Sequence, residues 1–125
     1  MIKVIGSALI KNTEGKYLAL KLKKEIVGNN YVPPGGKLEE NETLRECVIR
    51  EVKEELNIDI EVKVIKGITE EKYDDGIWTF VLFDSVIISG KPQIAEPDKI
   101  SELKWVELSE IKNSNSILWV DNNFK

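Results

Sequence analysis

The chain has 125 residues, of which 42% are hydrophobic and 32% charged, and its formal net charge is −4. This length predicts one domain over residues 1–125, and the acidic balance argues against a nucleic-acid or anionic-membrane partner. The absence of histidine excludes histidine-based acid–base catalysis and histidine metal sites, and the single cysteine excludes an internal disulfide.

The amino-terminal segment has no basic stretch followed by an apolar run, and no apolar run reaches the ~18 residues that a membrane-spanning helix needs. We therefore expect a cytoplasmic protein, monomeric or homodimeric, whose partner is a small molecule. The cysteine, Cys47, is expected to be a small buried side chain, because no histidine is available to activate it as a nucleophile.

The first predicted elements are two strands, Val4–Ile10 and Tyr17–Leu22, separated by a turn signal at residues 12–15. The second alternates leucines with polar residues, so we expect an antiparallel hairpin with one face in water. Lys21 and Lys23 are expected to be solvated there, and a contact with phosphate is the alternative. A proline-stiffened segment with paired glycines, Tyr31–Gly36, then allows the backbone to approach a ligand closely.

The next element is a predicted helix rich in carboxylates. Thr43 and Glu46 have the spacing of a capping box, so the helix should begin there, and Asn57 is suited to the left-handed conformation that ends a helix. Glu51, Glu54 and Glu55 share an arc of roughly 100° on one side. Like charges at this spacing repel, and carboxylates in the last turn face the negative end of the helix dipole.

An offsetting charge would explain this cluster, and carboxylate oxygens suit a hard divalent cation, above all Mg²⁺. Such an ion bridging protein and phosphate would neutralise developing charge and lower the pKa of an attacking water. The alternative is a solvated acidic helix face. That alternative is weakened by Glu55, which falls in the same angular sector as the apolar residues Leu44 and Val48.

After the helix, alternation from Ile58 to Val64 predicts a strand, and the polar stretch Thr69–Asp75 predicts a loop or strand end. Ile77–Ile88 is the most apolar stretch and predicts a long central strand. Ser109–Phe124 is expected to form a short helix that contains Ile117, Leu118 and Trp119. The order of elements predicts an α/β or α+β domain with a mixed sheet.

The segment from the paired glycines to the end of the helix resembles the Nudix box, G-x5-E-x7-R-E-U-x-E-E-x-G-U, where U is aliphatic. The residues that match are Gly36, Glu42, Arg50, Glu51, Val52, Glu54, Glu55 and Ile58. The one departure is Asn57, where the family has glycine. Because asparagine is the next-best residue for that conformation, the helix end should keep its geometry.

The resemblance implies an α/β/α sandwich, a curved mixed sheet between helices, with the box helix against one face. It implies hydrolysis of a nucleoside diphosphate linked to another group, above all a nucleoside triphosphate to monophosphate and pyrophosphate, with Mg²⁺ or else Mn²⁺ as cofactor. The implied catalytic residues are Arg50, Glu51, Glu54 and Glu55, and the implied metal ligands are Gly35, Glu51, Glu54, Glu55 and Glu96. Glu96 is included because residues 96–106, in the order E-P-x-K-x-x-E-x-x-W-V, resemble the stretch after the long strand in many Nudix triphosphate hydrolases, and a charged surface loop is the alternative. Glu42 and Arg50 should brace the loop against the helix through a bidentate pair, or Arg50 pairs with Glu46 instead. Which glutamate is the general base stays open.

Substrate contacts are assigned to Lys37, Trp119 and Asp121. The Trp-x-Asp order resembles the segment that holds the base in oxidised-purine triphosphatases, and the alternative places Trp119 in the core. Rival substrates are ADP-ribose, although its hydrolases often carry a proline where this chain has Gly67–Asp75, and dinucleoside polyphosphates, whose hydrolases have a tyrosine near the position of Tyr73. A non-catalytic nucleotide-binding module is the remaining alternative, but this chain retains every box glutamate.

Overall fold

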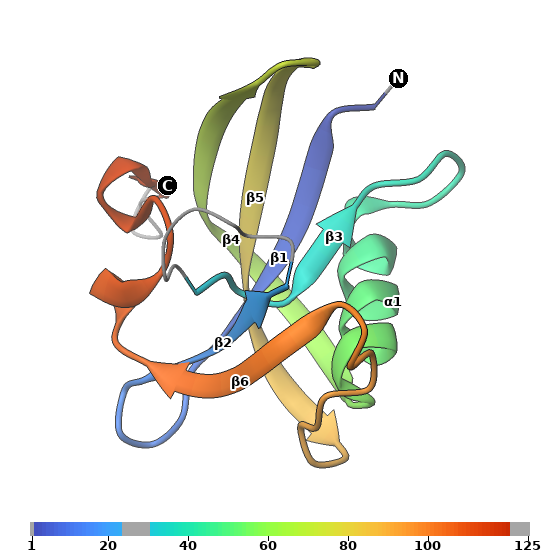
Figure 1. Cartoon of the computed structure of the whole chain (residues 1–125), viewed down its shortest axis with the longest axis vertical. Coiled ribbons are helices and arrows are strands. Elements are labelled where there is room, and N and C mark those ends of the chain that lie inside the picture. The colour runs from blue at the N-terminus through green and yellow to red at the C-terminus, as the bar shows by residue number, and fades with distance from the viewer. Residues whose placement is uncertain (1, 24–30, 121–125) are drawn as a thin grey trace.

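The computed structural model describes residues 2–23 and 31–120. Within these residues the chain forms one α-helix, two short 3₁₀ helices and two β-sheets (Figure 1). The larger sheet has the strand order β3-β1-β5-β4-β7, and its members are Gly35–Lys37 (β3), Val4–Ile10 (β1), Gly76–Ser89 (β5), Asp59–Tyr73 (β4) and Leu118–Trp119 (β7). Because β1 runs parallel to β5 while the other pairs are antiparallel, the sheet is mixed, as predicted.

The long apolar strand lies at the centre of this sheet, between β1 and β4, which confirms the sequence interpretation of residues 77–88. Strand β4 is longer than predicted, because the polar stretch that starts at Thr69 stays in the sheet as far as Tyr73. A tight turn at Asp74 and Asp75 then leads into β5 through Gly76, whose φ is 127°. Glycine tolerates this conformation, so the Asp-Gly pair closes a hairpin.

The predicted hairpin of the first two strands is wrong. After a single bridge from Lys11 to Tyr17 the strands separate, and β2 (Tyr17–Leu22) pairs with β6 (Ile100–Val106) in a second, two-stranded sheet. The physical reason is that neither face of β2 is exposed to solvent in the middle of the strand. Ala19 is fully buried, as are its leucine neighbours on the opposite face, so β2 packs between other elements rather than at the surface.

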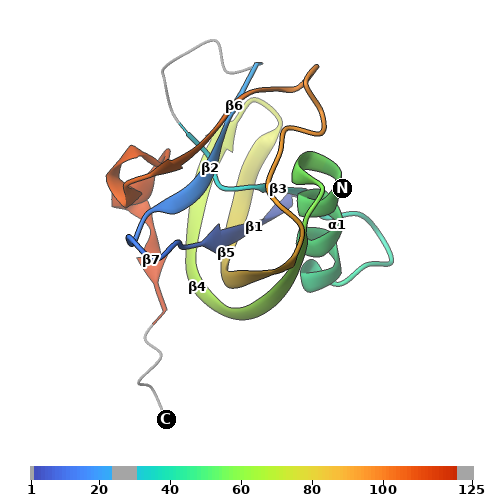
Figure 2. The same ribbon diagram turned by 90° about the horizontal axis from the view of Figure 1, so that it is seen from below.

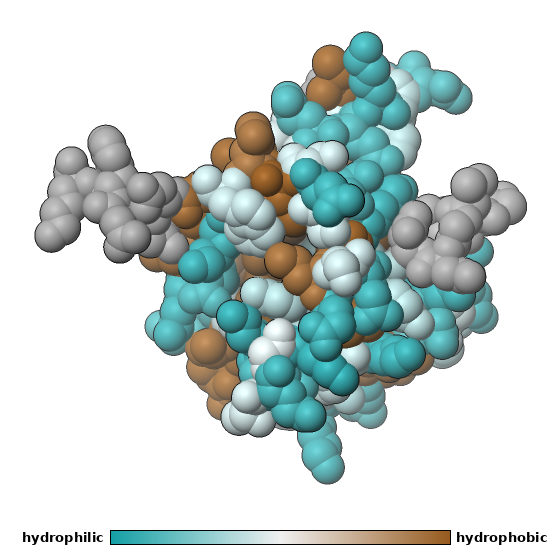
Figure 3. Space-filling view, turned by 90° about the vertical axis from the view of Figure 1, so that its left-hand side faces the viewer, coloured by the Kyte–Doolittle hydropathy of each residue, from teal (hydrophilic) through white to brown (hydrophobic). Residues whose placement is uncertain are grey.

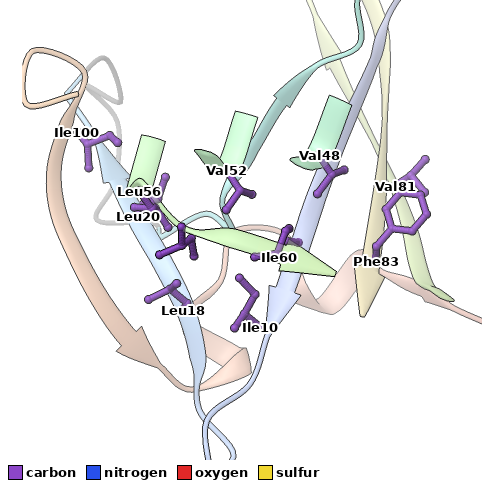
Figure 4. Close-up of a cluster of buried hydrophobic side chains, with 12 residues drawn as sticks. Ile10, Leu18, Leu20, Val48, Val52, Leu56, Ile60, Val81, Phe83 and Ile100 are labelled. Carbon is purple, nitrogen blue, oxygen red and sulfur yellow. The ribbon is translucent and has the colours of Figure 1, made fainter. Parts of the chain in front are cut away.

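Helix α1 (Leu44–Leu56) covers one face of the larger sheet (Figure 2). In Figure 4 the helix residues Val48, Val52 and Leu56 lie beside strand residues that include Ile10, Ile60 and Phe83. The contact is close, since a Cβ on Gly6 of β1 would lie 2.7 Å from Val48 Cγ2. This packing fixes the helix, and with it the glutamates, against the sheet.

The carboxyl-terminal helix predicted over residues 109–124 is not present in its described part. Residues 108–116 form two 3₁₀ helices, Leu108–Glu110 (η1) and Ser114–Ser116 (η2), and β7 follows. Asn113 has a positive φ of 62°, which interrupts any continuous helix, and β7 pairs with Gly67 and Ile68 of β4. This 3₁₀ segment lies across the larger sheet from α1, so it takes the place of a second helical layer in the residues that the structure describes (Figure 2).

No helix among the described residues has both the length and the apolar character needed to cross a membrane.

Candidate active site

Helix α1 begins and ends where the sequence predicts. The Glu46 backbone N–H donates to Thr43 Oγ1 at 3.1 Å, and the Thr43 N–H donates to Glu46 Oε1 at 2.8 Å. Asn57 adopts the left-handed conformation, with φ 55°, and its N–H donates to the Lys53 carbonyl at 3.0 Å. Because Glu46 serves as the cap, the alternative pair of Glu46 with Arg50 does not form.

Arg50 joins the loop to the helix. Its Nε and Nη2 donate to the two oxygens of Glu42 at 3.0 and 2.8 Å, which is the bidentate pair expected from the sequence. The guanidinium lowers the pKa of Glu42 to about 2. Its Nη1 also donates to Glu51 at 2.8 Å and to Glu54 at 3.3 Å. One cation therefore holds three carboxylates of the box together.

Glu55 is the buried carboxylate of the site. Its side chain is 9% exposed, and its Oε1 accepts a hydrogen bond of 2.9 Å from the Gly35 backbone N–H. Burial raises the pKa of Glu55 to about 8, and the negative charges of Glu51 and Glu96 add to this effect against the Gly35 hydrogen bond. A carboxylate at this depth needs a compensating charge when ionised.

Glu51 lies between Arg50 and the glycine strand. Burial raises its pKa, and the Arg50 contacts oppose that effect. A Cβ on Gly36 would overlap the Glu51 carboxyl group, so Gly36 must lack a side chain for the strand and the carboxylate to lie this close. The paired glycines therefore allow the close approach that the sequence indicated.

Glu96 reaches the box from a segment far away in the sequence. The Ala95 N–H donates to the Glu55 carbonyl at 2.9 Å, and the Gln93 N–H donates to the Leu56 carbonyl at 3.2 Å. These bonds hold the loop before β6 against the end of α1. As a result, the charge of Glu96 contributes to the pKa of both Glu51 and Glu55.

The chemistry of the donor set is compatible with a divalent cation. Within residues 2–23 and 31–120, no three acidic side chains form a ready-made metal cage, since Arg50 Nη1 contacts both Glu51 and Glu54. However, the nearby donors are carboxylate and backbone oxygens, and the buried Glu55 requires positive charge once it ionises. Glu51, Glu54, Glu55 and Glu96, with the Gly35 backbone, are the residues that would hold such an ion.

On the other face of the larger sheet lies a cavity of about 260 Å³, which we call the sheet-face cavity. Side chains at every second position line its floor: Ile5 and Ser7 of β1, Phe80 and Leu82 of β5, and Thr69, Glu71 and Tyr73 of β4. The 3₁₀ segment and β3 form its walls, and Gly35, Gly36 and Lys37 connect it to the carboxylates. Figure 3 views the side that carries the 3₁₀ segment, where hydrophobic residues show between polar ones.

The residues assigned to substrate from the sequence are not all brought together. Lys37 lines the sheet-face cavity, with its Nζ 5.2 Å from the centre of the Trp78 ring. Trp119 is 48% exposed on β7 and does not line the cavity, so its core alternative is wrong and its contact with a base stays a prediction. Asp121 lies outside the described residues. Lys21 forms an ion pair with Glu102 at 3.6 Å.

Cys47 is fully buried and its pKa is raised to about 12 by burial, as expected for a packing residue. Sequence reasoning missed the cavity residues Thr69, Glu71 and Asn113. A signal for two of them was present, because the Asp-Gly pair at residues 75–76 is typical of a hairpin turn. Extending β4 back from that turn places Thr69, Glu71 and Tyr73 on one face.

Comparison with known proteins gives consistent matches. A family model described as the NUDIX domain matches residues 3–123. The Bacillus subtilis (strain 168) protein named Uncharacterized Nudix hydrolase YvcI is 33% identical over 86 residues, which are 66% of this chain and 54% of that protein. The match thus spans about half the length of this relative.

Solved structures extend the match over most of the chain. A MutT NUDIX hydrolase from Burkholderia pseudomallei superposes with a TM-score of 0.78 and 26% identity, over 89% of this chain and 87% of that one. A MutT protein from Methanosarcina mazei Go1 gives a TM-score of 0.73 and 27% identity, over 86% and 78% of the two chains.

Proposed function

Because the chain belongs to the Nudix domain family, whose hydrolases act on nucleoside diphosphates linked to another group, we propose that it hydrolyses a nucleoside triphosphate. The products are the nucleoside monophosphate and pyrophosphate, and the cofactor is Mg²⁺, with Mn²⁺ as a substitute. The observation that carries this proposal is the buried Glu55 carboxylate. Three further carboxylates, those of Glu51, Glu54 and Glu96, raise its pKa, and it accepts a hydrogen bond from Gly35, which also lines the sheet-face cavity.

Each box residue has a distinct part in this reaction. Glu51, Glu54, Glu55 and Glu96 would hold the cation, and a cation held there would supply positive charge next to the phosphates and lower the pKa of the attacking water. Arg50 keeps Glu51 and Glu54 oriented and anchors the loop through Glu42. A water oxygen forms a bond to phosphorus, the α–β anhydride bond breaks, and a box glutamate accepts the water proton.

The location of the cavity supports a nucleotide as substrate. Gly35 and Gly36 border both the carboxylates and the sheet-face cavity, so a ligand in the cavity can extend a phosphate chain along β3 to the site. In this proposal Lys37, which lines the same cavity, contacts phosphate. The similar proteins from Burkholderia pseudomallei and Methanosarcina mazei Go1 are both MutT proteins, which favours a triphosphate.

Dinucleoside polyphosphate hydrolysis is the second candidate. The observation that favours it is Tyr73, which lines the sheet-face cavity and also a neighbouring, more open cavity of about 450 Å³ with Lys37 and Trp78. A second nucleoside could occupy that space. ADP-ribose belongs in the same assay because it carries the same diphosphate group.

A turnover assay tests the proposal. Purified protein with Mg²⁺ is incubated with purine and pyrimidine triphosphates, oxidised purine triphosphates, dinucleoside polyphosphates and ADP-ribose, and the products are separated. We expect monophosphate and pyrophosphate from a purine triphosphate, including an oxidised one, and no product in excess EDTA. Full activity in EDTA contradicts the metal role, and exclusive cleavage of ADP-ribose or a dinucleoside polyphosphate contradicts the triphosphate.

A further inference from the structure

The sheet-face cavity contains a buried hydroxyl group without a partner. Thr69 is 7% exposed, and its Oγ1 has no hydrogen-bond partner among the described residues. Such a group lowers the stability of the protein, because it has left water without gaining another contact. A hydroxyl that lines a cavity in this state is available to hydrogen-bond a molecule that occupies the cavity, whether a water or a ligand.

The surrounding residues leave space above this hydroxyl. Thr69 pairs with Phe80, which pairs with Ile5, so these three side chains form one row on the cavity floor. The preceding residue on the same face of β4 is Gly67, where a Cβ would lie 2.5 Å from Ile117 Cγ2. Ile117 therefore closes the space on that side, and Phe80 supplies an aromatic surface next to the hydroxyl.

A fixed polar group stands in the neighbouring wall. Asn113 adopts the left-handed conformation between the two 3₁₀ helices, and its Nδ2 donates to Glu71 Oε2 at 2.9 Å. Glu71 Oε1 is held in turn by Lys112 Nζ at 3.4 Å. Because the amide nitrogen is used in this way, the Asn113 oxygen is the atom left to accept a hydrogen bond.

These features define the chemistry of the ligand. The walls are mostly apolar, and their polar atoms include the Thr69 hydroxyl, which can donate or accept, and the Asn113 amide oxygen, which accepts. A flat heterocycle with a polar edge fits this arrangement, because its faces are apolar and its edge carries both donors and acceptors. Glu71 and Lys112 form an ion pair whose net charge is zero, so this part of the cavity wall does not favour a negatively charged ligand.

We propose that Thr69 determines substrate specificity by hydrogen-bonding the polar edge of the nucleotide base in the sheet-face cavity, with Asn113 contacting the same edge. This inference rests on the proposed function in that the base belongs to the nucleotide that is hydrolysed. It assigns base reading to residues other than Trp119 and Asp121. The phosphate chain then runs from the cavity past Gly36 to the carboxylates.

A matched pair of variants tests the role of the hydroxyl. Thr69→Val replaces it by a methyl group of similar size, and Thr69→Ser retains it. We expect Thr69→Val to raise the KM for the best triphosphate about ten-fold with kcat nearly unchanged, as for the loss of one buried hydrogen bond to a ligand. Thr69→Ser should stay within about two-fold of the wild type.

A binding experiment separates this inference from the proposed function. Calorimetric titration with guanosine and adenosine 5′-monophosphates, without turnover, compares wild type with Thr69→Val, and ribose 5-phosphate serves as the ligand that lacks a base. We expect the Kd of at least one nucleotide to rise about ten-fold in the variant and that of ribose 5-phosphate to stay constant. If no triphosphate is hydrolysed, the proposed function fails while this titration still decides the role of Thr69.

The melting temperature provides a second readout. Because the hydroxyl lacks a partner in the free protein, Thr69→Val should melt at the same temperature as the wild type or above it. A fall in melting temperature shows that the hydroxyl is already bonded and overturns the inference. Unchanged Kd values for both nucleotides also overturn it. Asn113→Gly, which keeps the left-handed backbone, should weaken nucleotide binding about five-fold and leave ribose 5-phosphate unaffected.

Discussion

On the face of the larger sheet toward α1, the strands leave no room for even one methyl group at Gly6, whereas on the opposite face the same strands leave a cavity of about 260 Å³. The two faces are built from alternate residues of the same strands, so this difference is encoded at every second position. The packed face fixes α1 and hence the glutamates. The open face leaves space for the nucleotide that we propose as substrate, and β3 lies between this space and the glutamates.

The largest expected effect is on the carboxylates at the edge of the packed face. Glu54→Gln and Glu55→Gln keep the side-chain shape but remove the charge that holds the cation, so turnover should fall by several orders of magnitude. The melting temperature without metal should stay level or rise, because repulsion at the end of the helix is relieved. A glutamine variant with normal turnover would assign these residues to a solvated helix face.

The next effect concerns stability and pH in the metal-free protein. Because the pKa of Glu55 is raised to about 8 in the folded state from an ordinary 4.5, the folded protein binds this proton more tightly than the unfolded chain. The resulting stability is fully present below about pH 4.5 and is lost as pH rises through about 8. The loss amounts to a few kcal/mol.

Urea unfolding of the metal-free protein between pH 5 and 9 measures this effect. The unfolding free energy of wild type should fall across the range, while that of Glu55→Gln should fall much less, by the part that Glu51 contributes because its pKa is also raised. The pKa of Glu42 is lowered to about 2, so Glu42 is ionised in both the folded and the unfolded state between pH 5 and 9. Its contribution to the unfolding free energy is therefore constant over this range. Equal slopes for wild type and Glu55→Gln would show that the carboxyl group of Glu55 is not buried in solution.

Two glycine substitutions separate packing from catalysis. Gly36→Ala places a methyl group against the Glu51 carboxyl group, so Glu51 must move, and we expect about a hundred-fold loss of turnover. Gly6→Ala instead presses on Val48 and Leu44 and should cost about 1–3 kcal/mol of stability through overpacking. Turnover and urea unfolding of both variants check this pair. If Gly36→Ala instead lost stability and Gly6→Ala lost turnover, Gly36 would be a packing residue and Gly6 would support the active site.

The smallest effect on stability is expected at Trp119. Because its side chain is 48% exposed, Trp119→Ala should change the unfolding free energy by less than about 1 kcal/mol, well below the 3–5 kcal/mol typical of a core tryptophan. If the residue stacks on the base, the KM should rise by tens-fold with the metal dependence unchanged. A KM that responds to Thr69→Val and not to Trp119→Ala would confine base recognition to the sheet-face cavity.

Those parts of the molecule whose signals are local could be predicted from the amino-acid sequence. The capping box, the asparagine at the end of α1 and the long apolar strand appear as predicted, because short-range hydrogen bonds and hydrophobic pattern fix them. The pairing of Arg50 with Glu42, expected from the resemblance to the Nudix box, is also present. The burial of Glu55 followed from its place in the apolar stripe of the helix.

The pairing of distant segments, in contrast, depends on tertiary contacts. Strand β2 pairs with β6 rather than with β1, its neighbour in sequence, because both faces of β2 become buried. The local sequence does not indicate which distant elements will bury these faces. The carboxyl-terminal segment formed 3₁₀ turns and a strand because β4 offered its edge to Leu118 and Trp119. Thr69 acquired its unpartnered hydroxyl in the same way, since burial of a polar side chain depends on elements that fold over it from elsewhere in the chain.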